Sequence, residues 1–339
     1  MANAKFFMKL KRLLISLGLA ALVGQVLHAQ QNDAGERQLA EIRGNAEKGD
    51  AKAECALGSA YDFGTLGVAT NKIEAVKWYR KAAEQNFAPA QYNLGVCYAY
   101  GNGTTKDEAE AVNWYRKAAE QNLAPAQSNL GLCYYDGKGV AKDEAEAVRW
   151  FRKAAEQNSA QAQYNLGDCY SSGRGVTKND AEAVKWYCKA AEQNIAVAQY
   201  DLGDCYRNGR GVAKDLAEAV SWYRKAAEQN FVQAQYNLGC CFSFGVGVAT
   251  NEQEAVKWWR RAAEQNFVQA QYNLGDHYKN ANGTEKDNVQ AYMWFKLASA
   301  QGDENAKNDL IQLKAEMSPN QIAAGDQRAN EWIQLHEKQ

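Results

Sequence analysis

The sequence predicts an all-α protein, a solenoid of about seven two-helix repeats with helical caps at both ends. The block Ala-Gln-Tyr-Asn-Leu-Gly begins at Ala90 and returns, with small changes, every 36 residues. The later copies begin at Ala126, Ala162, Ala198, Ala234 and Ala270. A fixed period of this length is typical of proteins that stack one helical unit on copies of itself. Such stacks present binding surfaces more often than catalytic groups.

The first helix of a repeat is best seen in residues 87–122, where it is expected over Pro89–Tyr100. Small and apolar residues recur there at helical spacing and give the helix one apolar face. They are Ala90, Leu94, Cys97 and Tyr98. Gly101-Asn102-Gly103 then ends the helix and turns the chain.

The second helix of this repeat is expected to begin at Asp107, which forms an Asp-x-x-Glu capping box with Glu110. In such a box the two side chains satisfy two helix N–H groups reciprocally. The pair recurs as Asn71/Glu74, Asp143/Glu146, Asn179/Glu182, Asp215/Glu218, Asn251/Glu254 and Asp287/Gln290. The helix ends at Asn122, and every other repeat has Asn or Gly there, as a left-handed C-terminal cap requires.

These signals divide the chain into four parts. Residues 1–29 form a signal peptide, 30–49 a lead-in helix, 50–315 the repeats, and 316–339 a C-terminal capping helix. The repeats span 50–86, 87–122, 123–158, 159–194, 195–230, 231–266 and 267–302, followed by one further helix. The last helix is opened by Ser318, and Ile322, Ala329, Trp332 and Ile333 are expected to cover the end of the stack.

The N-terminus has the features of a secretory signal. Four basic residues up to Arg12 precede the apolar run Leu13–Val26, and Ala29 offers a cleavage site before Gln30. The run of 14 residues is short for a membrane span, which needs about 20. An uncleaved anchor is the alternative. We expect export to a bacterial periplasm or beyond, and no membrane span after cleavage.

The charge balance excludes one class of partner. After Ala29 the chain has 35 Lys and Arg against 40 Asp and Glu, a net charge of −5. Such a balance favours solubility, and it lacks the excess of positive charge that is typical of proteins that bind nucleic acid.

Three short patterns recur together along the chain: Ala-x-x-x-Leu-Gly-x-x-Tyr, Gly-x-Gly-Val-x-Lys-Asp and Ala-x-x-Trp-Tyr-x-Lys-Ala-Ala. They are clearest in residues 162–191 and span roughly 50–315. This combination resembles the Sel-one-like repeat family, a branch of the tetratricopeptide-like helical repeats. The resemblance implies a right-handed α/α superhelix that serves as an adaptor in protein complexes. Some secreted, cysteine-rich members are linked to penicillin binding and β-lactam hydrolysis, but this chain has Ala119 and Gln127 at the positions we compare with their paired cysteines.

Eight cysteines in an exported chain suggest disulfides at first sight. Five of them share one repeated position on the apolar face: Cys97, Cys133, Cys169, Cys205 and Cys241. Copies on packed helices lie about 8–10 Å apart, whereas a disulfide needs Cα atoms within about 7 Å. We therefore expect small core residues. Cys55, Cys188 and Cys240 lie off this position, and a disulfide among them stays open.

No group of residues forms a recognisable catalytic set. The Gly-x-Gly loops follow helices, so they are expected to be caps and turns and not phosphate cradles. A Ser-x-x-Lys motif is absent, and only His277 and His336 follow the signal. The repeated Trp–aromatic pairs beside Ala are expected in the core. The sequence therefore predicts a protein that is not an enzyme and has no metal site and no cofactor.

The clue to function is a constant polar position flanked by changing residues on the first helix. Asn93 recurs as Asn129, Asn165, Asn237 and Asn273, with Asp201 in the remaining copy. The flanking positions change, and they include Tyr100, Asp168, Asp204, Phe244 and Asp276. We expect a concave groove in which the amides bind a peptide backbone and the changing residues select its sequence.

The leading functional prediction is an exported adaptor that binds a protein or an extended peptide. Asp168, Asp204 and Asp276 favour a basic segment in that ligand. The alternative for Asn93 and its copies is that they only join one repeat to the next. The alternative functions are a cell-wall or β-lactam-active enzyme and an envelope or polysaccharide-associated scaffold.

Overall fold

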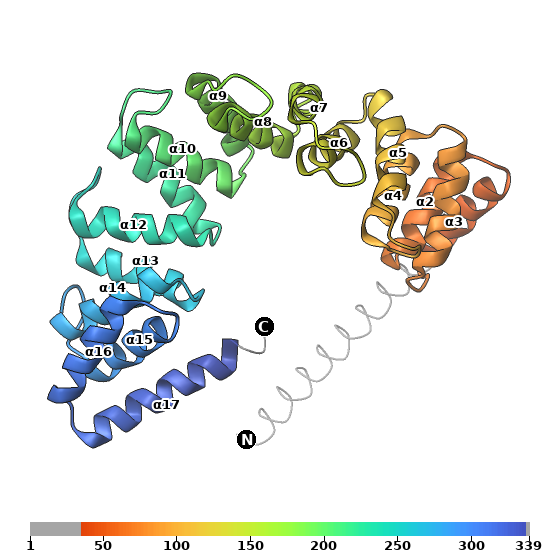
Figure 1. The fold of residues 1–339 in the computed structure, drawn as a ribbon. Coiled ribbons are helices and arrows are strands. Elements are labelled where there is room, and N and C mark those ends of the chain that lie inside the picture. Colours follow the sequence, from red (N-terminus) through yellow and green to blue (C-terminus); the bar gives the residue numbers. More distant parts are fainter. Residues whose placement is uncertain (1–34, 337–339) are drawn as a thin grey trace, which may run out of the picture. The chain divides into compact units, whose positions relative to one another are not determined.

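The computed structural model describes residues 35–336, and this part of the chain is helical and has no strand. Its helices form two compact units, unit 1 ending at Ser159 and unit 2 beginning at Ala160 (Figure 1). The predicted signal segment lies outside the described residues. Within residues 35–336, no helix combines the length and the apolar character that a membrane span requires.

Unit 1 begins with a helix over residues 35–47 and continues with three helix pairs. In each pair the first helix contributes mainly small residues and Leu to the core, and the second contributes aromatic residues and Ala. The pairs are α2 (Ala51–Phe63) with α3 (Lys72–Glu84), α4 (Ala88–Tyr100) with α5 (Glu108–Glu120), and α6 (Ala124–Asp136) with α7 (Glu144–Glu156).

Unit 2 contains four such pairs and two closing helices. The pairs are α8 (Ala160–Ser172) with α9 (Asp180–Glu192), α10 (Ala196–Asn208) with α11 (Leu216–Glu228), α12 (Val232–Phe244) with α13 (Glu252–Glu264), and α14 (Val268–Asn280) with α15 (Asn288–Ala300). The closing helices are α16 (Glu304–Glu316) and α17 (Pro319–His336). Ala329 of α17 is buried, and Ile322, Trp332 and Ile333 pack on the core. The prediction of an all-helical array of seven two-helix repeats is confirmed.

The second helices begin at the predicted cap residues, but the predicted reciprocity of the capping box is wrong. Asp107 accepts the N–H of Glu110 at 2.9 Å, as expected. Its own N–H donates to the carbonyl of Tyr98 at 2.9 Å and has no need of the Glu110 side chain. The same backbone bond recurs at every other cap of the series. The carboxylates are therefore free for other contacts, and Glu74 pairs with Lys77 on the same helix. Ser318 and Gln321 do bond reciprocally.

The helix ends follow the predicted cap chemistry. Asn122 has a φ of 65°, in the left-handed region, and its five asparagine copies have φ between 64° and 68°. Gly49 and Gly302 occupy the same place at the two ends of the array, with φ of 85° and 91°. Asn and Gly tolerate this conformation best, which explains why these two residue types alternate there.

Two glycine positions of the repeat permit close approach, as Gly95 and Gly139 show. A Cβ on Gly95 would lie 2.7 Å from ring atoms of Tyr115, so the aromatic ring packs directly on helix α4. The second glycine of the loop after α6, Gly139, has a φ of +67° and lies against α5. A Cβ there would lie 2.0 Å from the carbonyl oxygen of Glu108. The Gly-x-Gly loops are therefore turns, as expected. The loops after α4, α6, α10, α12 and α14 also lie against the second helix of the preceding repeat.

All eight cysteines lie within the described residues as free thiols. Cys97, Cys169, Cys205 and Cys241 are buried on the apolar face, while Cys133 is partly exposed. Burial raises the pKa of Cys97, Cys133, Cys205 and Cys241 to about 11. A thiol with so high a pKa is a poor nucleophile at neutral pH.

Candidate functional site

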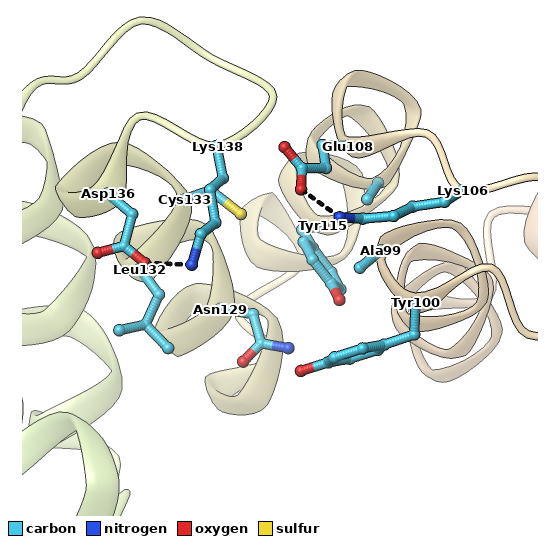
Figure 2. A pocket seen from close by; sticks show the side chains of 11 residues that line it. Ala99, Tyr100, Lys106, Glu108, Tyr115, Asn129, Leu132, Cys133, Asp136 and Lys138 are labelled. Carbon is cyan, nitrogen blue, oxygen red and sulfur yellow. Dashed lines mark hydrogen bonds and ion pairs between the residues drawn. The ribbon is translucent and has the colours of Figure 1, made fainter.

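A cavity of about 390 Å³ opens in unit 1 between the end of α4 and helix α6 (Figure 2). Two of the predicted groove residues line it, Tyr100 from α4 and Asn129 from α6. Leu132 and Asp136, from the changing positions of α6, line it as well. The helix pairing creates this arrangement, because equivalent faces of α4 and α6 lie side by side once each repeat docks on the one before it.

Two ion pairs border the cavity, and each joins a loop lysine to a carboxylate at the end of a helix. Lys106 lies 2.8 Å from a carboxylate oxygen of Glu108, and Lys138 lies 2.7 Å from one of Asp136. Figure 2 shows each lysine extended toward its partner, with the Lys138 pair near Leu132 and the Lys106 pair near Tyr115. Both pairs are largely exposed, so they contribute little to folding stability. Their charges balance, which leaves the cavity bordered by cations and anions in equal number.

Asn129 and Tyr100 form another part of the cavity lining and face each other in Figure 2. Asn129 bonds to the hydroxyl groups of Tyr92 and Tyr115, whose pKa values are raised by burial. Tyr100 has no such constraint, since 74% of its side chain surface is exposed. Leu132 is also exposed, at 37%. The cavity therefore combines a fixed polar floor with two apolar side chains that are available to a ligand.

The asparagine ladder makes contacts between neighbouring repeats, which is the alternative that the sequence left open. The Asn93 side chain lies 3.8 Å from the sulfur of Cys55 on α2. In unit 2, Asn237 donates to the hydroxyl of Tyr200 at 3.5 Å, and Asn273 bonds Tyr236. In these bonds the amide nitrogen is the donor, so the amide oxygen is the atom that could accept a hydrogen bond from a ligand. A role for these residues in ligand binding stays a prediction.

Asn165 differs from the other copies. Its side-chain oxygen accepts a bond from Gln161 at 3.1 Å, while its amide nitrogen is buried and has no partner among the described residues.

Three predicted aspartates lie together in unit 2, on α8 and α10. Asp201 accepts a bond from Tyr164, and burial together with the charges of Asp204 and Asp168 raises its pKa to about 6. Asp204 is engaged on both sides: it accepts from the Tyr223 hydroxyl and lies 3.3 Å from Arg207. The cluster is therefore acidic but partly neutralised by its own surroundings.

The remaining predicted residues of unit 2 are spread over α12 and α14. Phe244 ends α12 with 74% of its side chain exposed. Asp276 accepts a bond from Asn280 at 2.7 Å. Within residues 35–336, no three side chains of His, Cys, Asp or Glu gather to hold a metal ion.

Sequence reasoning missed the residues that give the cavity its charge. Lys106 and Glu108 flank the cap residue of α5, and Lys138 is the central residue of a Gly-x-Gly loop. The repeated Gly-x-Gly-Val-x-Lys-Asp pattern marked these positions as a turn, and nothing local showed that the turn borders a cavity. Leu132 and Asp136 could have been found, because they occupy the changing positions beside Asn129.

The comparisons with known proteins agree with this architecture. The family described as Sel1 repeat matches seven consecutive segments: residues 51–87, 88–123, 124–159, 160–195, 196–231, 232–267 and 268–303. Among curated proteins, chitin synthase regulatory factor 3 of Schizosaccharomyces pombe is 34% identical over 67 residues. That match covers 20% of this chain and 7% of the yeast protein, so the chain spans a small part of this curated relative.

Two solved structures share both fold and sequence with the chain. One is a protective antigen present in uropathogenic Escherichia coli strains and displaying an SLR fold: 35% identity, a TM-score of 0.66, and coverage of 87% of this chain and 70% of that one. The other is a Sel1 repeat protein from Oxalobacter formigenes: 33% identity, a TM-score of 0.67, and coverage of 83% and 81%.

Proposed function

Because the chain belongs to the Sel1 repeat family, whose members typically act as scaffolds for protein–protein interaction, we propose that it is an exported adaptor that binds an extended peptide segment of a partner protein. The observation that carries the proposal is the cavity of about 390 Å³ between α4 and α6. Its lining includes the predicted groove residues Tyr100 and Asn129. It also includes Leu132 and Asp136, which occupy changing positions of α6. The predicted signal at the N-terminus supports export.

The chemistry of the cavity suits a peptide. The amide oxygen of Asn129 can accept from a backbone N–H, and the lysines and carboxylates can exchange their partners for those of a ligand. Tyr100 and Leu132 can hold an apolar side chain, and burying one such group contributes about 1.5–3 kcal/mol. Tyrosine is enriched among the residues that dominate protein interfaces.

The test uses purified residues 30–339 and a random peptide library displayed on phage. Selected peptides, labelled with fluorescein, are titrated by fluorescence anisotropy. Tyr100→Ala and Leu132→Asp are each expected to weaken binding at least fivefold. Ile73→Asp is the matched control, because Ile73 is an exposed apolar residue of α3 in the same unit and does not line the cavity. Selection of no peptide, or equal affinity for the wild type and Leu132→Asp, would contradict the proposal.

The acidic cluster of unit 2 extends the proposal to a basic ligand segment. Asp168→Lys with Asp204→Lys is expected to weaken binding of an Arg- or Lys-rich peptide and to leave a neutral peptide unaffected. The same loss for both peptides would indicate damage to the fold. Export is tested separately, by sequencing the N-terminus of the mature protein, which we expect to begin at Gln30.

A further inference from the structure

A second cavity lies on α13, a second helix of its repeat, and is independent of the proposed peptide site. It has a volume of about 460 Å³ and opens between α13 and the loop that follows α14. Figure 1 shows these two helices as neighbours in unit 2. Three of its lining side chains are cations, Lys257, Arg260 and Arg261, and one is a carboxylate, Glu264.

Both arginines are oriented by aromatic rings. The guanidinium carbon of Arg261 lies 4.7 Å from the ring centroid of Trp258, and that of Arg260 lies 5.7 Å from the ring of Tyr278. Arg260 also donates to the Tyr278 hydroxyl. Lys257 is paired with Glu254 at 3.1 Å, but among the described residues neither guanidinium is ion-paired with a carboxylate. Two pre-oriented positive charges therefore face solvent, and Glu264 is the one carboxylate in the lining of this cavity.

The loop after α14 adds a hydroxyl group beside these cations. Gly283 has a φ of +66°, and a Cβ at this position would lie 2.4 Å from the carbonyl group of Glu252. The loop is thus held closely against the first turn of α13, and it places Thr284 in the lining of the cavity. A threonine hydroxyl donates readily to an anion.

Comparison of the repeats shows that the fold does not require three cations on the second helix together with a threonine in the following loop. Helix α3 comes near to it, with the three cations Lys77, Arg80 and Lys81 and with Thr104 in the loop, but lysine stands there where α13 has Arg261. The other repeats lose a cation or the hydroxyl: Asn113 or Ser221 replaces the first lysine, Cys188 replaces the arginine, and Val140, Val176, Val212 or Val248 replaces the threonine.

We propose that the α13 cavity binds a phosphomonoester group. The planar fork of a guanidinium matches phosphate oxygens bidentately, and two unpaired arginines suit a group with more than one negative charge. A carboxylate ligand would leave one of them uncompensated. A free phosphorylated molecule and the headgroup of phosphatidic acid share this chemistry, and the experiment distinguishes them.

The experiment uses residues 30–339 carrying Arg80→Ala and Lys81→Ala, so that the similar arrangement on α3 is removed and α13 is measured alone. Inorganic phosphate is titrated calorimetrically in a phosphate-free buffer of low ionic strength. Vesicles of phosphatidylcholine with and without phosphatidic acid are tested by co-sedimentation. Arg260→Ala with Arg261→Ala is then added. The matched control is Arg224→Ala with Lys225→Ala, which changes the equivalent positions of α11.

Saturable phosphate binding that the α13 variant weakens at least tenfold, and the α11 control leaves unchanged, supports the site with a free ligand. Sedimentation that requires phosphatidic acid and both α13 arginines supports it with a lipid headgroup. Absence of both effects, or an equal loss in the α11 control, overturns the proposal. Circular dichroism verifies that the exposed substitutions leave the helices intact.

Discussion

Gln121 donates its side-chain amide to the side-chain oxygen of Gln91 at 2.7 Å. This bond joins the C-terminal end of α5 to the first turn of α4, its partner in the same helix pair. Gln91 is buried and passes the chain of bonds on, donating to the carbonyl of Ala83 at 3.2 Å and to Asn86 at 3.1 Å. The glutamine pair recurs with the same 2.7 Å spacing as Gln157/Gln127, Gln193/Gln163, Gln229/Gln199 and Gln265/Gln235. This glutamine ladder links successive repeats through buried polar groups, and it explains why glutamine is constant at this position of the block.

The ladder makes a prediction about stability. Gln199→Leu removes three side-chain hydrogen bonds: the two that Gln199 donates to the carbonyl of Ala191 and to Asn194, and the one that it accepts from Gln229. Such a loss costs about 2 kcal/mol. We expect a reduction of that size in the free energy of unfolding, measured by urea denaturation. Gln233→Leu is the control, because Gln233 is exposed on α12 and should change stability by less than about 0.5 kcal/mol. Equal effects of the two substitutions would show that the ladder contributes no stability.

The glutamine ladder also shows where the sequence stops being informative. The αL asparagines and the helix starts were predictable, because a cap involves residues within one turn of each other. Gln121 and Gln91 lie 30 positions apart, and their bond depends on how the two helices of one pair, α4 and α5, pack on each other. The failed capping box has the same cause: the N–H of Asp107 finds the carbonyl of Tyr98, which local pattern does not reveal.

The candidate site was predictable only in part, for a related reason. Asn129 and Tyr100 could be placed on one face from helical spacing alone. The cavity between them depends on the side-chain volumes of two helices and on a loop lysine, Lys138, that the repeat pattern marks only as a turn residue.

The docking of the loops predicts a large effect of one methyl group. Gly139→Ala places a Cβ 2.0 Å from the carbonyl oxygen of Glu108, in addition to forcing alanine into a positive φ. We expect a loss of more than about 3 kcal/mol in unfolding free energy, because overpacking adds to the backbone strain. Gly67→Ala separates the two causes, since Gly67 has a φ of +83° but no atom within 4 Å of its Cβ position. That control should lose about 1–2 kcal/mol; the same loss in both variants would mean that the close contact relaxes.

Asp201 predicts a stability that depends on pH. Its pKa is raised from 3.8 to about 6 in the folded protein, so the folded state binds this proton more tightly than the unfolded chain. Stability is then lost as the pH rises from about 4 to 6, and the loss is complete at neutral pH. Two pKa units correspond to about 2.7 kcal/mol, which partial exposure of the side chain reduces to about 1–2 kcal/mol.

Asp201→Asn should remove that cost, since asparagine occupies this position in the other copies and its oxygen can still accept from Tyr164. We expect the variant to be more stable than the wild type at pH 7 and equally stable near pH 4, as judged by urea denaturation at both values. Asp215→Asn is the control, because Asp215 is an exposed cap residue and asparagine fills the same place in other repeats. A gain of equal size at both pH values would contradict the assignment to the Asp201 carboxylate.

The cysteines predict a contrast between native and denatured protein. In denaturant, a thiol reagent should titrate eight groups, because all eight cysteines are free. In native protein at pH 8, labelling should be slow, since burial holds the pKa of Cys97, Cys205 and Cys241 at about 11.

Cys133 is expected to react differently from these three cysteines. Its pKa is equally high, but it is partly exposed in the wall of the cavity and should be modified before the other three. Cys133→Ala tests this, because it should remove the earliest labelling event among these four and leave the others unchanged. A peptide that binds the cavity should slow modification of Cys133 selectively, and undiminished labelling of Cys133 at saturating peptide would place the ligand elsewhere.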